Sequence, residues 1–148
     1  MEGFRKILVP IDFSEHSARA LEQAMALART FGSELHLLHC YQINIGAISP
    51  YGIVLPESFE RDVRRAAIAR LAEWREKVSA EGIRVEEHVT PQFPSEAIVQ
   101  MAEELAVDLI VMGTRGLTGL KHVLLGSVAE RTLRLAPCPV LAVKDRAT

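Results

Sequence analysis

The chain alternates short, continuously apolar runs with longer segments in which apolar residues recur every three or four positions. The runs 6–11 and 108–112 are typical of central strands that are covered on both faces of a parallel sheet. Two further strands are predicted at 34–41 and 140–143. Apolar and polar residues alternate over 83–89, which predicts an edge strand that is half exposed.

Helices are predicted in the segments that join these strands, namely 14–31, 58–80, a segment opening at Pro94, and 127–135. Ser14 is expected to be the N-cap of the first helix, and Gly32 is expected to end it. On the last helix we expect Val128 and Leu133 to point inward.

The resulting order, βαβαβαβαβ without a repeat or a linker, predicts one α/β domain over 1–148. Right-handed connections make it a doubly wound, five-stranded parallel sheet with helices on both faces. If the first and fourth strands are neighbours where the winding direction reverses, Asp12 and Gly113 lie beside one ligand crevice.

The connection between the fourth strand and the last helix is long and rich in glycine. It carries glycines at 113, 116, 119 and 126, whereas such connections usually need only about 2–6 residues. Glycines let backbone approach a ligand closely, and a helix that begins near Gly126 and Ser127 offers unpaired N–H groups to an anion. The segment is therefore either a phosphate-binding loop or a glycine-rich turn with Ser127 as N-cap. It matches neither the P-loop nor the G-x-G-x-x-G pattern.

Composition and charge narrow the classes of function. The net charge is −2, from 17 basic and 19 acidic residues, so there is no overall attraction to nucleic acid. Acidic residues interleave with the arginines of the long helix, which predicts a solvated face. No apolar run approaches the roughly 20 residues that cross a bilayer. Cys40 and Cys138 lie in apolar strands without metal-type spacing, so we expect buried free thiols in a reducing cytoplasm.

Other features allow more than one interpretation. The segment 42–57 follows the carboxyl end of a strand, and it either covers a ligand or partner or is a variable insertion. Side chains that are candidates for phosphate contact, or else exposed, are Arg115, Lys121 and His122. Asp12 is also a second N-cap candidate for the first helix. We expect His36 and His39 to be packed or capped side chains, and we predict no metal ligands.

The spacing Gly113-x2-Gly116-x9-Gly126-Ser127 resembles the ATP-binding signature of the universal stress protein family. Segments similar to other parts of that family lie at 6–12, 17–21, 108–116, 126–131 and 137–140. The resemblance spans essentially the whole chain. It implies strand order 3-2-1-4-5 and a homodimer in which the fifth strands, Val140–Val143, pair with each other.

The resemblance also implies a nucleotide site at the carboxyl ends of the strands. Its residues, carried over position by position, are Pro10, Ile11 and Asp12 at the adenine–ribose end, Cys40 through its main chain at adenine, Met112 and Gly113 beside the ribose, and Gly116, Gly126, Ser127 and Val128 at the phosphates. Mg²⁺ or a similar ion is expected to accompany the phosphates.

Three functions compete on this basis. The first is an ATP-binding regulatory protein, which we favour. The second is a slow ATP hydrolase or phosphotransferase, although the sequence from Gly113 to Ser127 lacks the carboxylate or glutamine that usually orients a nucleophile. The third is a dimeric interaction module without nucleotide, which the intact glycines argue against. AMP or a cyclic nucleotide would use the same adenine pocket as ATP.

Overall fold

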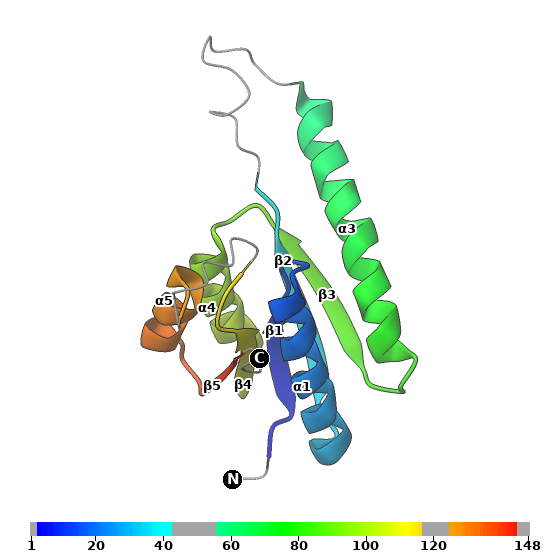
Figure 1. Ribbon diagram of the computed structural model, residues 1–148. Coiled ribbons are helices and arrows are strands. Elements are labelled where there is room, and N and C mark those ends of the chain that lie inside the picture. The colour runs from blue at the N-terminus through cyan, green and yellow to red at the C-terminus, as the bar shows by residue number, and fades with distance from the viewer. Residues whose placement is uncertain (1–2, 43–55, 117–124, 145–148) are drawn as a thin grey trace.

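The computed structural model describes residues 3–42, 56–116 and 125–144. Its strands form one five-stranded sheet in the order β3-β2-β1-β4-β5, and every neighbouring pair is parallel. The strands are β1 (Lys6–Pro10), β2 (Glu34–Cys40), β3 (Val85–Thr90), β4 (Leu109–Gly113) and β5 (Val140–Val143). The predicted α/β class and strand order are confirmed (Figure 1).

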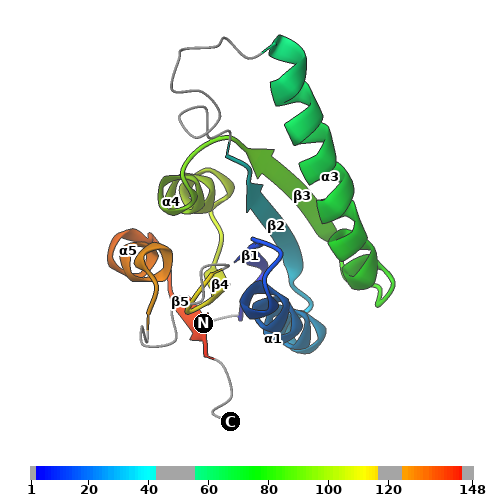
Figure 2. The same cartoon turned by 45° about the horizontal axis from the view of Figure 1, so that its top comes forward.

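Helices cover both faces of this sheet. They are α1 (Glu15–Phe31), α3 (Glu57–Ser79), α4 (Pro94–Leu105) and α5 (Ser127–Leu135). Helices α1 and α3 lie on one face, and α4 and α5 lie on the other (Figure 2). The doubly wound arrangement follows from right-handed crossovers between parallel strands.

The core has two layers because each strand sends alternate side chains to opposite faces. One layer, under α1 and α3, includes Ile7, Val9, Leu37 and Val111, all fully buried. The other layer, under α4 and α5, is built around Leu8 and Ile110, which are also fully buried, together with residues of the two helices. Strands β1 and β4 contribute to both layers, which confirms their prediction as central strands.

The helix ends follow the local sequence. The hydroxyl of Ser14 accepts a hydrogen bond from Ser17 N at 3.1 Å, so Ser14 is the N-cap of α1 as predicted. Gly32 ends the same helix in the left-handed conformation, with φ of 70°. One orientation was predicted wrongly: Leu133 of α5 is 44% exposed. The buried residues of that helix are Ala129 and Thr132, so the buried face is centred on smaller side chains.

The two sheet edges differ in how they are covered. The predicted edge strand is confirmed as β3, whose residues are half exposed except for the more exposed Glu86. At the other edge lies β5, where Leu141 is 40% exposed. Among the residues that the structure describes, no helix is long and apolar enough to cross a membrane.

Candidate functional site

The first part of the candidate site is a tight turn that follows β1. Asp12 Oδ1 accepts hydrogen bonds from the main-chain N of Ser14, at 2.9 Å, and from the Ser14 hydroxyl. Ser14 is the N-cap of α1, so Asp12 is not. Asp12 instead stabilises the turn that leads from β1 into this helix. This arrangement holds the Asp12 carboxylate at the carboxyl end of β1.

Phe13, in the middle of this turn, has a positive φ of 66°. An aromatic residue in the left-handed region costs on the order of 1–3 kcal/mol, so its surroundings must hold it there. The Phe13 ring lies 4.3 Å from the His39 ring and 5.6 Å from the Trp74 ring, measured between centroids, and the Arg70 guanidinium lies 4.3 Å above it. Packing against β2 and α3 thus stabilises the turn that carries Asp12. This strain could not be predicted from the sequence, because nothing local to Phe13 favours a positive φ.

The second part is the glycine-rich connection that follows β4, and it lies directly against the first. A β-carbon built on Gly116 would be 2.8 Å from Asp12 Oδ2. A β-carbon on Gly113 would be 2.9 Å from the His16 β-carbon, on the first turn of α1. Position 113 requires glycine, because the α1 backbone at His16 also lies within 3.1 Å of such a carbon. At position 116 a β-carbon would force the Asp12 carboxylate to move. The expectation that Asp12 and Gly113 lie beside one crevice is consistent with this geometry.

Both ends of the connection are held together at its base. Gly126 N donates to Thr114 O at 2.5 Å, and Thr114 N donates to Val143 O at 3.2 Å. A β-carbon on Gly126 would be 3.2 Å from Thr114 O, closer than such contacts usually are. Position 126 therefore also favours glycine, although less strictly than position 113.

The third part is the amino terminus of α5. Its N-cap is Gly126, and no side-chain hydrogen bond from the described residues caps the helix. Ser127 is the first helical residue and is exposed, so the alternative in which Ser127 is the N-cap is wrong. A helix start without a side-chain cap leaves main-chain N–H groups and the positive end of the helix dipole for an anion.

The expected adenine end lies where β1 and β2 finish. Ile11 N donates to Leu38 O at 2.8 Å, and His39 Nδ1 donates to Ile11 O at 2.7 Å, so the Ile11 backbone is fixed between the two strands. Burial lowers the pKa of His39, although its hydrogen bond to Ile11 and the charge of Asp12 act in the opposite direction. Burial raises the pKa of Cys40 from 9.0 to about 12, so its thiol is neutral. Cys40 offers main-chain groups at this end rather than a reactive sulfur.

Pro10 and Met112 also lie at these strand ends, as predicted, at the last position of β1 and the penultimate position of β4. Val128 lies in the first turn of α5, half buried against the layer under α4 and α5. The predictions for Lys121 and His122, and for the segment 42–57 except at its ends, fall outside the described residues.

A separate hollow of about 500 Å³ lies at the opposite, amino-terminal ends of β2 and β3. Residues from both strands, from α3 and from the connection between α3 and β3 line it, among them Glu34, Arg75, Arg84 and Glu86. None of its lining residues is a predicted nucleotide ligand. The geometry at the carboxyl ends and this hollow are therefore two distinct places on the molecule.

The chain is similar in sequence to proteins of one family. A family model described as the universal stress protein family matches residues 3–144. Universal stress protein YxiE of Bacillus subtilis is 37% identical over 147 residues, which cover 95% of this chain and 99% of that protein. Universal stress protein MJ0577 of Methanocaldococcus jannaschii is 32% identical over 156 residues, which cover 97% of this chain and 96% of that protein.

The fold is similar to solved structures as well. The structure of the hypothetical protein MJ0577 matches with a TM-score of 0.78 and 33% identity, covering 97% of this chain and 98% of that chain. A universal stress protein solved in complex with cAMP matches with a TM-score of 0.69 and 26% identity, covering 96% of this chain and 98% of that chain.

Proposed function

The chain belongs to the universal stress protein family, and we propose that it is a regulatory protein that binds an adenine nucleotide, ATP, as a homodimer. Partner proteins would distinguish the nucleotide-bound form from the nucleotide-free form. The free thiols Cys40 and Cys138 suit a reducing cytoplasm, where we propose that it acts.

The observation that carries this proposal is the close approach of Gly116 to Asp12 beside the start of α5. It brings together a carboxylate, a glycine-rich backbone and a helix start without a side-chain cap. That combination suits a ligand with a ribose and a phosphate chain, because hydroxyls pair with a carboxylate and phosphates pair with main-chain N–H groups. A solved relative in complex with cAMP supports the adenine class.

The proposed contacts follow the order of the strands. Pro10, Ile11 and the Cys40 main chain line the adenine, and Asp12, Met112 and Gly113 flank the ribose. The phosphates would lie against the main chain of Gly116 and Gly126 and accept hydrogen bonds from the N–H groups of Ser127 and Val128. The Gly126 N–H itself already donates to Thr114 O. The Ser127 hydroxyl, which is exposed, adds a further donor.

Mg²⁺ would accompany the triphosphate, because that ion prefers oxygen ligands and is usually held by one or two carboxylates together with phosphates. Asp12 is the carboxylate that lies against the glycine-rich connection, with Oδ2 directed toward Gly116. Because this carboxylate is proposed to pair with the ribose hydroxyls, the oxygen ligands of Mg²⁺ would come mainly from the phosphates and from water. The ion would neutralise the repulsion between Asp12 and the phosphates.

Rapid hydrolysis is not part of this proposal. Phosphoryl transfer needs a residue that orients the nucleophile as well as charge stabilisation. The sequence from Gly113 to Ser127 contains no Asp, Glu or Gln. We therefore expect the chain to bind ATP and to hydrolyse it slowly at most.

The homodimer is proposed to form through β5. This strand ends the sheet in the described residues and exposes Leu141. Unpaired edge strands are prone to pair with other strands, so antiparallel pairing of two β5 strands would satisfy this edge.

The test of the function is calorimetric titration of the purified, nucleotide-free chain with ATP, with and without Mg²⁺. We expect one ATP per chain, and we expect Gly126→Val to abolish binding while the variant keeps its fold by circular dichroism. The valine would place branched carbons against Thr114 O and at the helix start. Unchanged ATP affinity in the folded variant would contradict the site.

A further inference from the structure

Two neighbouring strands carry the same short pattern, Glu-x-His, on the same face of the sheet. On β2 it is Glu34 and His36, and on β3 it is Glu86 and His88. Residues two apart on a strand share a face, and the sheet register pairs His36 with Glu86. The four side chains therefore gather on the face away from α3, at the edge of the sheet.

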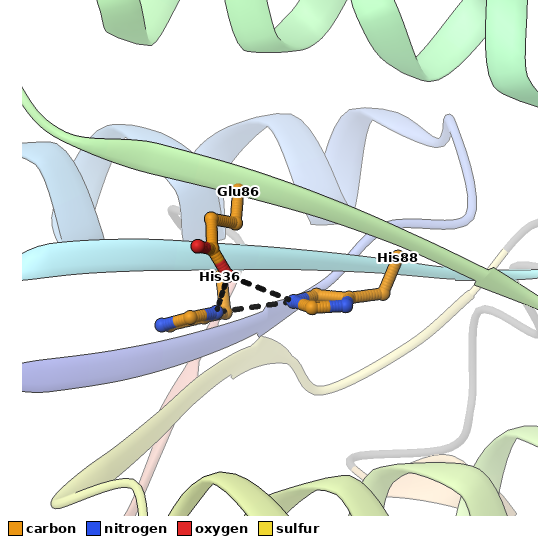
Figure 3. Close-up of side chains that lie close together, drawn as sticks. All are labelled: His36, Glu86 and His88. Atoms are coloured by element: carbon orange, nitrogen blue, oxygen red, sulfur yellow. Dashed lines mark hydrogen bonds and ion pairs between the residues drawn. The ribbon is translucent and has the colours of Figure 1, made fainter.

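Three of these side chains direct their polar atoms at one point (Figure 3). His36 Nδ1 lies 3.0 Å from His88 Nε2 and 3.5 Å from Glu86 Oε2. His88 Nε2 lies 3.9 Å from the same oxygen. The His36 ring is buried, with 3% of its side chain exposed, whereas the side chains of His88 and Glu86 are 23% and 69% exposed.

These separations match those between ligands of a small divalent ion. Tetrahedral Zn²⁺ holds histidine nitrogen and carboxylate oxygen at about 2.0–2.2 Å, which places ligand atoms about 3.3–3.6 Å apart. The three observed distances, 3.0, 3.5 and 3.9 Å, lie on both sides of that spacing. A small adjustment of the exposed Glu86 side chain, with the two imidazole nitrogens moving a few tenths of an ångström apart, would make the triangle regular.

A second carboxylate orients the buried histidine. Glu34 Oε1 lies 2.8 Å from His36 Nε2, so this nitrogen carries the proton and donates to Glu34. In the neutral imidazole, which is the form that binds a metal, the lone pair of the opposite nitrogen, Nδ1, is then directed at His88 and Glu86. A carboxylate behind a histidine is the usual support of a metal-bound imidazole, because it fixes the tautomer and raises the basicity of the ligand.

We propose that His36, His88 and Glu86 form a binding site for a divalent transition metal of the zinc type. Two imidazole nitrogens and one carboxylate oxygen suit Zn²⁺ better than Mg²⁺ or Ca²⁺, which prefer oxygen ligands. The site has three protein ligands, so the fourth position is left for water or for another ligand. Glu34 is a positioning residue that acts through His36.

The three candidate ligands can be reached from solvent. The side chains of Glu86 and His88 are 69% and 23% exposed, which gives an ion a path to the buried His36. A bound ion would cross-link β3, the half-exposed edge strand, to β2. We therefore expect metal binding to stabilise this edge of the sheet, at a place separate from the proposed nucleotide site.

The test uses the full chain, without nucleotide and without an affinity tag, titrated calorimetrically with Zn²⁺. We expect one Zn²⁺ per chain and a rise in the thermal unfolding midpoint. Co²⁺ in the same site should give the intense visible absorption of a four-coordinate ion. His88→Gln should weaken Zn²⁺ binding by at least about 100-fold, and Glu34→Gln should weaken it about 10- to 100-fold, the range known for lost supporting partners.

The matched control is Glu87→Gln. Glu87 is adjacent to both proposed β3 ligands but lies on the other face, where it pairs with Arg75 at 3.5 Å. This variant should bind Zn²⁺ as the unaltered chain does. Absence of Zn²⁺ binding, or binding that His88→Gln leaves unchanged, would overturn the proposal and would mean that the histidines form a hydrogen-bonded pair only. Because nucleotide is absent, neither result bears on ATP binding.

Discussion

Gly116 lies so close to Asp12 that a β-carbon at position 116 would be 2.8 Å from the Asp12 Oδ2 atom. The two residues are more than 100 positions apart in sequence, and they meet because β1 and β4 are neighbours in the sheet. The contact brings the turn after β1 and the connection after β4 together. The proposed ribose and phosphate positions adjoin for this reason.

We predict that Gly116→Ala weakens ATP binding at least tenfold, on the order of 1.4 kcal/mol. The new methyl group must displace the Asp12 carboxylate or the backbone of the connection. The measurement is ATP titration, with circular dichroism to show that the fold persists. The control is Gly82→Ala, at a distant position with φ of +78°, which should lower stability but leave ATP affinity unchanged. Equal affinity in Gly116→Ala would mean that this contact does not shape the site.

For the dimer, we predict that Leu141→Glu produces a monomer. Leu141 is 40% exposed on the edge strand β5, and a charge there would have to be buried in a strand-to-strand interface. Light scattering after size-exclusion chromatography measures the mass. Ile68→Glu is the control, since Ile68 is 42% exposed on α3 at the other side of the sheet. A Leu141→Glu protein that stays dimeric would contradict the β5 interface.

The Cys40 thiol should be unreactive in the folded chain near pH 8. Burial raises its pKa from 9.0 to about 12, so the neutral form is favoured on folding. The same shift means that stability is lost as pH rises from 9 toward 12, because the unfolded thiol ionises first. A Cys138→Ser chain isolates the signal in a colorimetric thiol assay. Reaction of native Cys40 at the rate seen in denaturant would show that this pKa is not raised.

Thr132→Val should raise the free energy of unfolding by about 1–2 kcal/mol. Thr132 is fully buried, and its hydroxyl has no hydrogen-bond partner among the described residues. Valine keeps the shape and removes the unpaired polar group. Chemical denaturation measures the change, with Thr30→Val as a nearly neutral control, because the Thr30 hydroxyl is exposed and donates to Ala26 O at 3.1 Å. Loss of stability in Thr132→Val would reveal a partner for the hydroxyl.

Much of the fold was predictable because its determinants are local. Apolar runs and caps such as Ser14 and Gly32 mark strand and helix ends directly in the sequence. Because crossovers between parallel strands are right-handed, few strand orders are then possible for alternating strands and helices. Leu133 was predicted wrongly because periodicity favours the larger apolar residue, whereas α5 packs through Ala129 and Thr132.

The candidate sites were predictable only in part. The glycines at 113, 116 and 126 indicated a loop. The contacts that favour glycine at 116 and 113 are long-range contacts with Asp12 and His16, which the sequence does not reveal. The paired Glu-x-His pattern was visible, yet its meaning depended on β2 and β3 being neighbours in a specific register. Sequence spacing alone does not reveal that His36 and His88, 52 positions apart, are in contact.

The most direct test of the central claim is to titrate the ¹⁵N-labelled chain with ATP and Mg²⁺ and to map the amide shifts by NMR. We predict saturable shifts at Gly113, Gly116 and the start of α5, while Arg84 and Glu86, at the distant hollow, stay unchanged. Shifts centred on the hollow, or no saturable shifts, would contradict nucleotide binding at the carboxyl ends of the strands.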